Sequence, residues 1–132
     1  MKATDIMIGD WVRNDLDEIQ QVQEIRSDSE NSVMLAYGDF YGFDEIEPVK
    51  LTSPILERNE FHEESTGRFI ARGLDGLLIK WEVVIRKSAE SMYLDIEAYS
   101  AEYNNFSGAG FLFVHELQHA LRLCGIEKEI IL

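Results

Sequence analysis

The 132-residue chain has little of several features that define common protein classes. Its one cysteine, Cys124, excludes an internal disulfide framework and a zinc site built from several cysteines, and it favours a reducing, cytoplasmic setting. No segment approaches the roughly 18 uninterrupted apolar residues of a transmembrane helix. The residues after Met1 also lack the apolar segment of an export signal, so we expect neither export nor membrane insertion.

Basic residues are also scarce. The chain has 12 Lys and Arg against 25 Asp and Glu, which gives a net charge of −13. Such a charge repels nucleic-acid phosphates and anionic lipids, so nucleic acid is disfavoured as a partner and no membrane partner is expected. Residues 1–51 hold 12 of the acidic residues and 4 of the basic ones, a net charge of −8. Any partner drawn by charge is therefore expected to be a basic protein.

Short apolar runs broken by turn-forming residues predict an N-terminal β-module over residues 1–51. We expect a bulge in the second strand, because the step from Ile19 to Val22 breaks strict alternation. Four or five short strands in about fifty residues are the size of an SH3-like small β-barrel. The expected strands cover residues 6–12, 19–25, 32–37 and 43–49.

Residues 52–67 predict a short helix and a linker. Thr52, Ser53 and Pro54 resemble a helix start, because proline suits the first helical position. The helix is expected over residues 54–60, and the polar segment 62–67 is expected to be a turn between two modules.

Residues 68–132 predict a three-stranded antiparallel sheet packed by a C-terminal helix, which makes the whole chain α+β. Strands are expected from Arg68 to the turn at Asp75-Gly76, over 77–86 and over 92–99, followed by a loop over 101–110. Helical spacing then predicts a helix over 111–124, ended by Gly125, with Cys124 on its packed side.

That helix contains the spacing of a zinc hydrolase, His115-Glu116-x-x-His119. Two imidazoles one helical turn apart can bind one Zn²⁺, and Glu116 could act as the general base on a metal-bound water. However, no third histidine follows, and the helical period sets His115 and His119 opposite the apolar side of the helix. We therefore expect a solvent-facing pair and no cofactor, with a zinc-dependent hydrolase as the alternative.

Four aromatic residues close together in the N-terminal module are candidates for a binding surface, and they are Tyr37, Phe40, Tyr41 and Phe43. Rings gathered in a small barrel can form a shallow groove for peptides. The alternative is that two of them fill the core and two shield the hairpin. The acidic residues that would select basic partners around such a groove are Asp39, Asp44, Glu45 and Glu47.

Three short blocks resemble a family of small uncharacterised bacterial and phage-borne proteins. They are Ile8-Gly9-Asp10-Trp11-Val12, the segment from Ile46 to Thr52, and Val114-His115-Glu116-Leu117-Gln118. In the family these blocks run roughly I-G-N-W/Y-V, I-x-P-I-P-L-T with a short helix ending in G-F, and Y-V-H-Q-L-Q-N. The chain departs from this pattern at Asp10, Glu60, Glu116 and His119. The resemblance implies no activity, cofactor or partner, but it does suggest a phage or mobile-element origin.

Taken together, the sequence predicts a non-enzymatic protein-interaction module that binds a protein through its barrel. The zinc-dependent hydrolase is the enzymatic alternative. A third hypothesis is that the acidic N-terminal third mimics nucleic acid, which predicts salt-sensitive binding to a basic groove.

Overall fold

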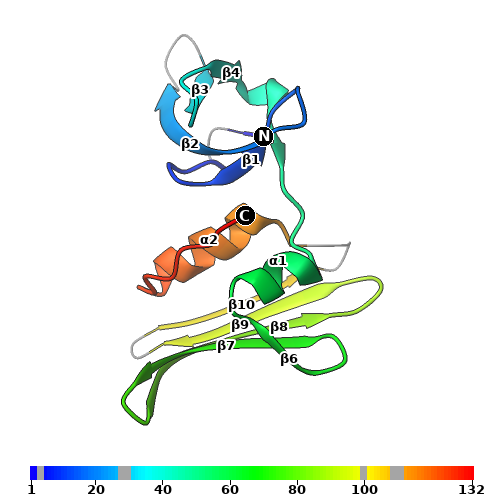
Figure 1. Cartoon of the computed structure of the whole chain (residues 1–132), viewed down its shortest axis with the longest axis vertical. Coiled ribbons are helices and arrows are strands. Elements are labelled where there is room, and N and C mark those ends of the chain that lie inside the picture. Colours follow the sequence, from blue (N-terminus) through cyan, green and yellow to red (C-terminus); the bar gives the residue numbers. More distant parts are fainter. Residues whose placement is uncertain (3–4, 27–30, 99–100, 108–111) are drawn as a thin grey trace. The chain divides into compact units, whose positions relative to one another are not determined.

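The structure is a computed structural model that describes residues 1–2, 5–26, 31–98, 101–107 and 112–132 (Figure 1). The chain divides into two compact units. The first unit comprises Met1–Lys50 with Phe113–His115, and the second comprises Leu51–Leu112 with Glu116–Leu132. Each unit contains its own antiparallel sheet, and helices are present, so the α+β class is confirmed.

The first unit is built on a five-stranded antiparallel sheet of described strands, in the order β4-β3-β2-β1-β5. Its strands are β1 (Trp11–Arg13), β2 (Ile19–Arg26), β3 (Ser32–Leu35), β4 (Phe40–Gly42) and β5 (Glu47–Pro48). The predicted irregularity in the second strand is confirmed, since the register of β2 against β3 shifts between Val22 and Glu24. The small apolar core of this unit comprises Ile6, Val12, Val22, Val33, Leu35 and Ile46.

Three strands predicted in this unit are shorter in the structure, and the one predicted over 32–37 ends at Leu35. Phe43–Glu45 form a 3₁₀ helix (η2), so the strand predicted over 43–49 is wrong apart from β5. The Glu45 carboxylate accepts the Gly42 N–H at 2.9 Å, and this local bond competes with strand pairing. The strand predicted over 6–12 begins only at Trp11 for a similar reason. Asp10 Oδ2 accepts the Met7 N–H at 2.8 Å, and this bond holds the preceding residues in a turn.

The second unit contains a larger antiparallel sheet, with described strands in the order β10-β9-β8-β7-β6. They are β6 (His62–Ser65), β7 (Arg68–Asp75), β8 (Leu78–Lys87), β9 (Met92–Ala98) and β10 (Ala101–Ser107). The three central strands match the prediction, but the turn predicted over 62–67 and the loop predicted over 101–110 contain the two edge strands. The described residues of β6 are all exposed, so this strand lacks the alternating apolar pattern on which the prediction depends.

Helices cover one face of this sheet (Figure 1). They are α1 (Ser53–Arg58) and α2 (Val114–Leu123). Pro54 stands in the first turn of α1 as expected, and the turn after α2 contains Gly125 at φ +71°. The helix predicted over 111–124 is shorter in the structure: residue 111 lies outside the described residues, and Phe113 forms an isolated antiparallel bridge with Lys50 before the helix begins at Val114. The helix-facing side of the central strands is buried, at Phe69, Ala71, Val83, Ile85, Met92, Leu94 and Ile96.

Neither helix of the described chain has the length and apolar composition needed to cross a bilayer.

Candidate functional site: an aromatic and acidic surface on the first unit

The four candidate aromatic residues divide into two pairs. Tyr41 and Phe43 are half-buried and pack against the apolar core of the first unit. Tyr37 and Phe40 are exposed, with 77% and 43% of their surface accessible. The exposed part of the predicted groove therefore consists of Tyr37, in the turn between β3 and β4, and Phe40, at the start of β4.

Strand register explains why Phe40 and Tyr41 differ. Tyr41 is directly opposite Val33, a core residue, whereas Phe40 is opposite Met34. Adjacent residues of a strand point to opposite faces, so Phe40 lies on the outer face of the sheet. The Tyr41 hydroxyl is held by the buried Asn14, whose Nδ2 donates to it at 3.2 Å.

A cation already stacks on Phe40. The Arg26 guanidinium carbon lies 4.2 Å from the centre of the Phe40 ring. Arg26 Nε also donates to Glu24 Oε1 at 3.0 Å, so the stacked arginine lies beside a carboxylate. Aromatic rings attract cations through their electron-rich faces, and this arrangement displays that chemistry on the outer face of the sheet.

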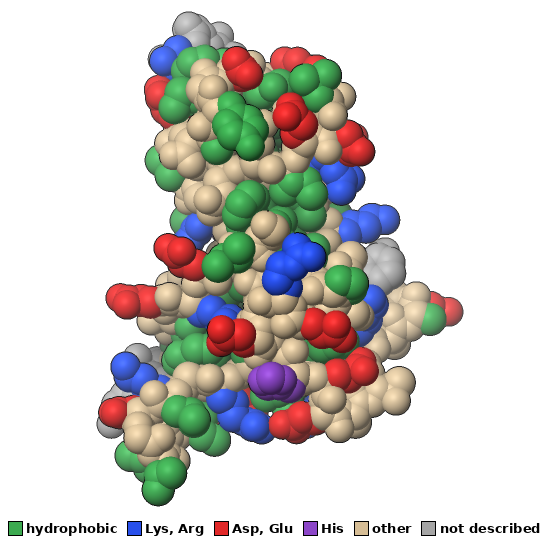
Figure 2. All heavy atoms as spheres, in the orientation of Figure 1, with side chains coloured by type: hydrophobic (Ala, Val, Ile, Leu, Met, Phe, Trp, Pro, Cys, Tyr) green, Lys and Arg blue, Asp and Glu red, His purple; other side chains and the backbone are tan. Residues whose placement is uncertain are grey.

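The predicted acidic rim is accessible to solvent. Asp39, Asp44, Glu45 and Glu47 are all exposed. Figure 2 shows acidic side chains among apolar ones over the upper part of the visible face. A surface of exposed rings and carboxylates can recognise arginine and lysine, because the rings stack on the cation and the carboxylates neutralise it.

The histidine pair of α2 differs from the prediction. His115 is buried, with 7% of its surface exposed, and its ring stacks on Phe113 at 5.8 Å between centroids and 15° between planes. His119 is only partly exposed, whereas Arg122 is exposed. His115 and Arg122 lie on the same side of the helix, so the expected side was right but its exposure was wrong for His115. A helical period gives the direction of a residue around the axis, and it ignores differences in burial along the axis.

The described residues provide no third protein ligand for a zinc ion at His115 and His119. Glu116 is partly exposed, one residue after His115 in α2. Within the described ranges, no group of three or more His, Cys, Asp or Glu side chains is arranged to hold a metal ion. Cys124 is buried as predicted, and desolvation raises the pKa of its thiol.

An apolar hairpin tip in the second unit was not predicted from the sequence. The β7–β8 turn exposes four large aliphatic side chains, with Leu77 fully accessible. They are Leu74, Leu77, Leu78 and Ile79. The available signal was the unbroken run of three apolar residues after Gly76, since a tight hairpin end cannot bury side chains on both faces.

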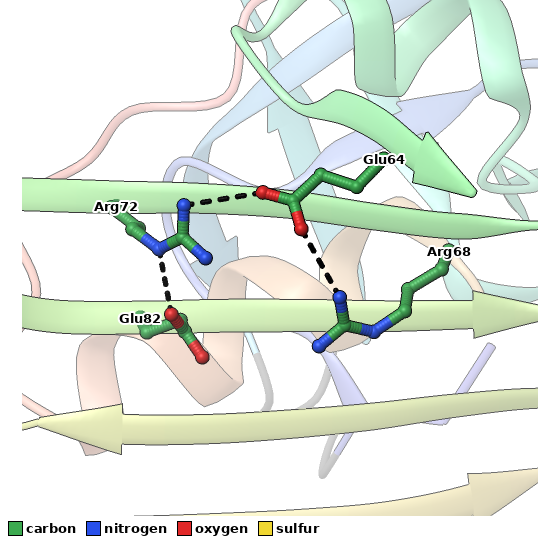
Figure 3. Close-up of polar contacts among 4 residues, drawn as sticks. All are labelled: Glu64, Arg68, Arg72 and Glu82. Atoms are coloured by element: carbon green, nitrogen blue, oxygen red, sulfur yellow. Dashed lines mark hydrogen bonds and ion pairs between the residues drawn. The ribbon is translucent and has the colours of Figure 1, made fainter.

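An ionic network on the open face of the second sheet was also missed (Figure 3). Glu64 accepts from Arg68 and from Arg72, each at 3.2 Å, and Arg72 Nε donates to Glu82 at 2.7 Å. The hydrogen bond to Glu82 raises the pKa of the Arg72 guanidinium.

Comparison of the chain with protein-family models, with curated proteins and with solved structures gave no match.

Proposed function

We propose that the chain is a non-enzymatic protein-interaction module whose first unit binds a basic segment of a partner protein. The observation that carries this proposal is the exposure of Tyr37 and Phe40 beside exposed carboxylates. Large rings that remain in water contribute nothing to folding by burial, whereas tyrosine is enriched where proteins recognise each other.

Charge supports the choice of a basic partner. The first 50 residues hold 12 acidic and 4 basic side chains, a net charge of −8. A field of this sign accelerates the approach of a cationic segment and opposes an anionic one. A partner arginine could stack on the Tyr37 ring as Arg26 stacks on Phe40.

The proposal includes three finer assignments. The first unit is taken to be an SH3-like small barrel, supported by its short strands and by the bulge in β2, since a bulge increases the twist that curves a sheet. The phage or mobile-element origin depends on the resemblance of the three sequence blocks. The non-enzymatic character depends on the sequence, in which no recognisable set of nucleophile and base occurs outside the HELQH helix.

The test is quantitative recovery of partners from a lysate, combined with binding of an arginine-rich synthetic peptide. The test variant is Tyr37→Ala with Phe40→Ser, because changes at Tyr41 or Phe43 would damage the core. The matched control is Leu77→Ser, which removes a fully exposed apolar side chain from the second unit. We expect the test variant to weaken peptide binding about tenfold, and added salt to weaken binding by the unaltered chain.

Thermal unfolding of each variant shows whether it folds, and Tyr37→Ala alone serves if the double variant does not. Equal peptide affinity and equal recovery of every partner by the unaltered chain and the folded test variant would contradict the proposal. Loss of binding in Leu77→Ser with retention in the test variant would assign the interaction to the hairpin tip instead.

A further inference from the structure

We propose that the second unit has an anion site that takes a single tetrahedral oxyanion such as a phosphoryl group. The site is an open cavity of about 380 Å³ where the β6–β7 turn meets the β8–β9 turn.

 The residues that line the cavity of the proposed site include Arg68, Arg86 and several with hydroxyl groups, and no Asp or Glu is among them.

Two arginines face each other across the strands at this cavity. Arg68 of β7 is directly opposite Arg86 of β8, and Arg86 is directly opposite Tyr93 of β9. Side chains directly opposite in an antiparallel pair share a face, with their Cβ atoms about 5 Å apart. Two like charges at this separation destabilise the sheet, and a bound anion would relieve that repulsion.

The carboxylates of this face leave Arg86 without a counterion. Glu64 is shared between Arg68 and Arg72, and Glu82 binds Arg72 (Figure 3). Arg86 forms no ion pair with any residue that the structure describes, and its guanidinium carbon lies 5.9 Å from the centre of the Tyr93 ring. A guanidinium has five N–H donors, so Arg86 and the remaining donors of Arg68 can bind one oxyanion from two sides.

The two turns at the cavity are held in place by backbone contacts. The Lys87 N–H donates to the Gly67 carbonyl at 2.6 Å, and a Cβ at position 67 would overlap the Lys87 carbonyl oxygen. Ser65 and Thr66 line the cavity, and their hydroxyls form no hydrogen bond with the described residues. These hydroxyls can donate to an oxyanion that the arginines hold.

Charge on the neighbouring strands limits the ligand to a small anion. The same face of β9 and β10 presents Asp95, Glu97 and Glu102, in register with Val84 and Glu82. A polyanion that extended beyond the cavity would meet these carboxylates and the overall charge of −13. One phosphoryl group needs only the space between the two turns.

The test is a titration of the full chain with inorganic phosphate at constant ionic strength, followed by amide chemical shifts. We expect saturable shifts confined to residues 65–68 and 86–91. Arg86→Gln should weaken binding about tenfold or more, because it removes a charge-assisted pair of hydrogen bonds. The matched control is Arg58→Gln, which makes the same change in net charge at an exposed position in α1.

Arg68→Gln serves as a second variant, and circular dichroism confirms that each variant folds. A phosphomonoester that binds as well as inorganic phosphate assigns the site to a phosphoryl group on a larger molecule, and a weaker one assigns it to the free ion. Three results would overturn the proposal: no saturable shift, equal weakening by Arg58→Gln and Arg86→Gln, or tighter binding of a single-stranded oligonucleotide than of phosphate.

Discussion

The side chain of Asn59 forms two hydrogen bonds with the backbone of Ile131, 72 residues further along the chain. Its Nδ2 donates to the Ile131 carbonyl at 2.8 Å, and its Oδ1 accepts the Ile131 N–H at 2.7 Å. Asn59 is 4% exposed, so neither bond is readily replaced by water. The residue that follows α1 therefore binds the C-terminal segment within the second unit.

Asn59→Ala should lower the free energy of unfolding by about 1–3 kcal/mol, because it removes both hydrogen bonds to the Ile131 backbone and the one from Nδ2 to the Ile55 carbonyl. Urea denaturation measures this change. Glu57→Ala, at an exposed position of the same helix, should change stability by less than about 0.5 kcal/mol. Equal stability of the two variants would show that the contact to Ile131 contributes nothing.

Glu60→Gly should stabilise the chain by about 0.5–1 kcal/mol. Glu60 follows α1 with φ +68°, a left-handed conformation that favours glycine. Its ion pair with Lys128 is long, 3.9 Å, and the Glu60 side chain is 86% exposed, so little is lost with it. In contrast, Glu57→Gly inside α1 should destabilise the chain, and a lower melting temperature for Glu60→Gly would refute the argument.

Gly73→Ala should displace the Trp81 ring. The two residues are directly opposite in β7 and β8, and a Cβ on Gly73 would overlap the indole. We expect a loss of about 1–3 kcal/mol from this overpacking and a shift of Trp81 fluorescence, measured in a Trp11→Phe background. The same substitution made together with Trp81→Leu should cost much less, and an equal cost in both backgrounds would exclude the ring as the cause.

Alkaline pH should destabilise the fold partly through Cys124. Burial raises the pKa of the folded thiol above that of the unfolded chain, so the unfolded state loses its proton first. The resulting stability is fully present below the unfolded pKa and is lost as pH rises through the folded pKa. Unfolding free energies measured against pH should therefore fall less steeply in Cys124→Ala, and identical slopes would contradict the assignment.

Protein purified without a histidine tag should contain no stoichiometric zinc, and a chelator should leave its melting temperature unchanged. His115 is buried against Phe113, and the described residues offer no three-ligand group around it. Elemental analysis provides the measurement. One zinc per chain that disappears in His119→Ala would restore the zinc-hydrolase alternative.

The sequence by itself determined the strands and helices whose buried faces show a regular apolar pattern. The strands β7, β8 and β9, a short helix with Pro54 in its first turn and the bulge in β2 follow from local sequence pattern. Edge strand β6 was hidden, because its exposed side chains are free to be polar. The sequence also did not show which of the predicted binding rings are exposed. Phe40 and Tyr41 are adjacent, and only the strand register assigns each ring to a face of the sheet.

Only the tertiary structure decided which polar residues are exposed to solvent and which charged side chains lie next to each other. His115 and Arg122 share a side of α2, yet one is buried and the other exposed, because burial depends on what surrounds each turn of the helix. Arg68 and Arg86 are 18 residues apart in the sequence, and strand pairing sets them directly opposite each other. Local pattern determines conformation, whereas contacts between distant residues exist only after the strands have paired.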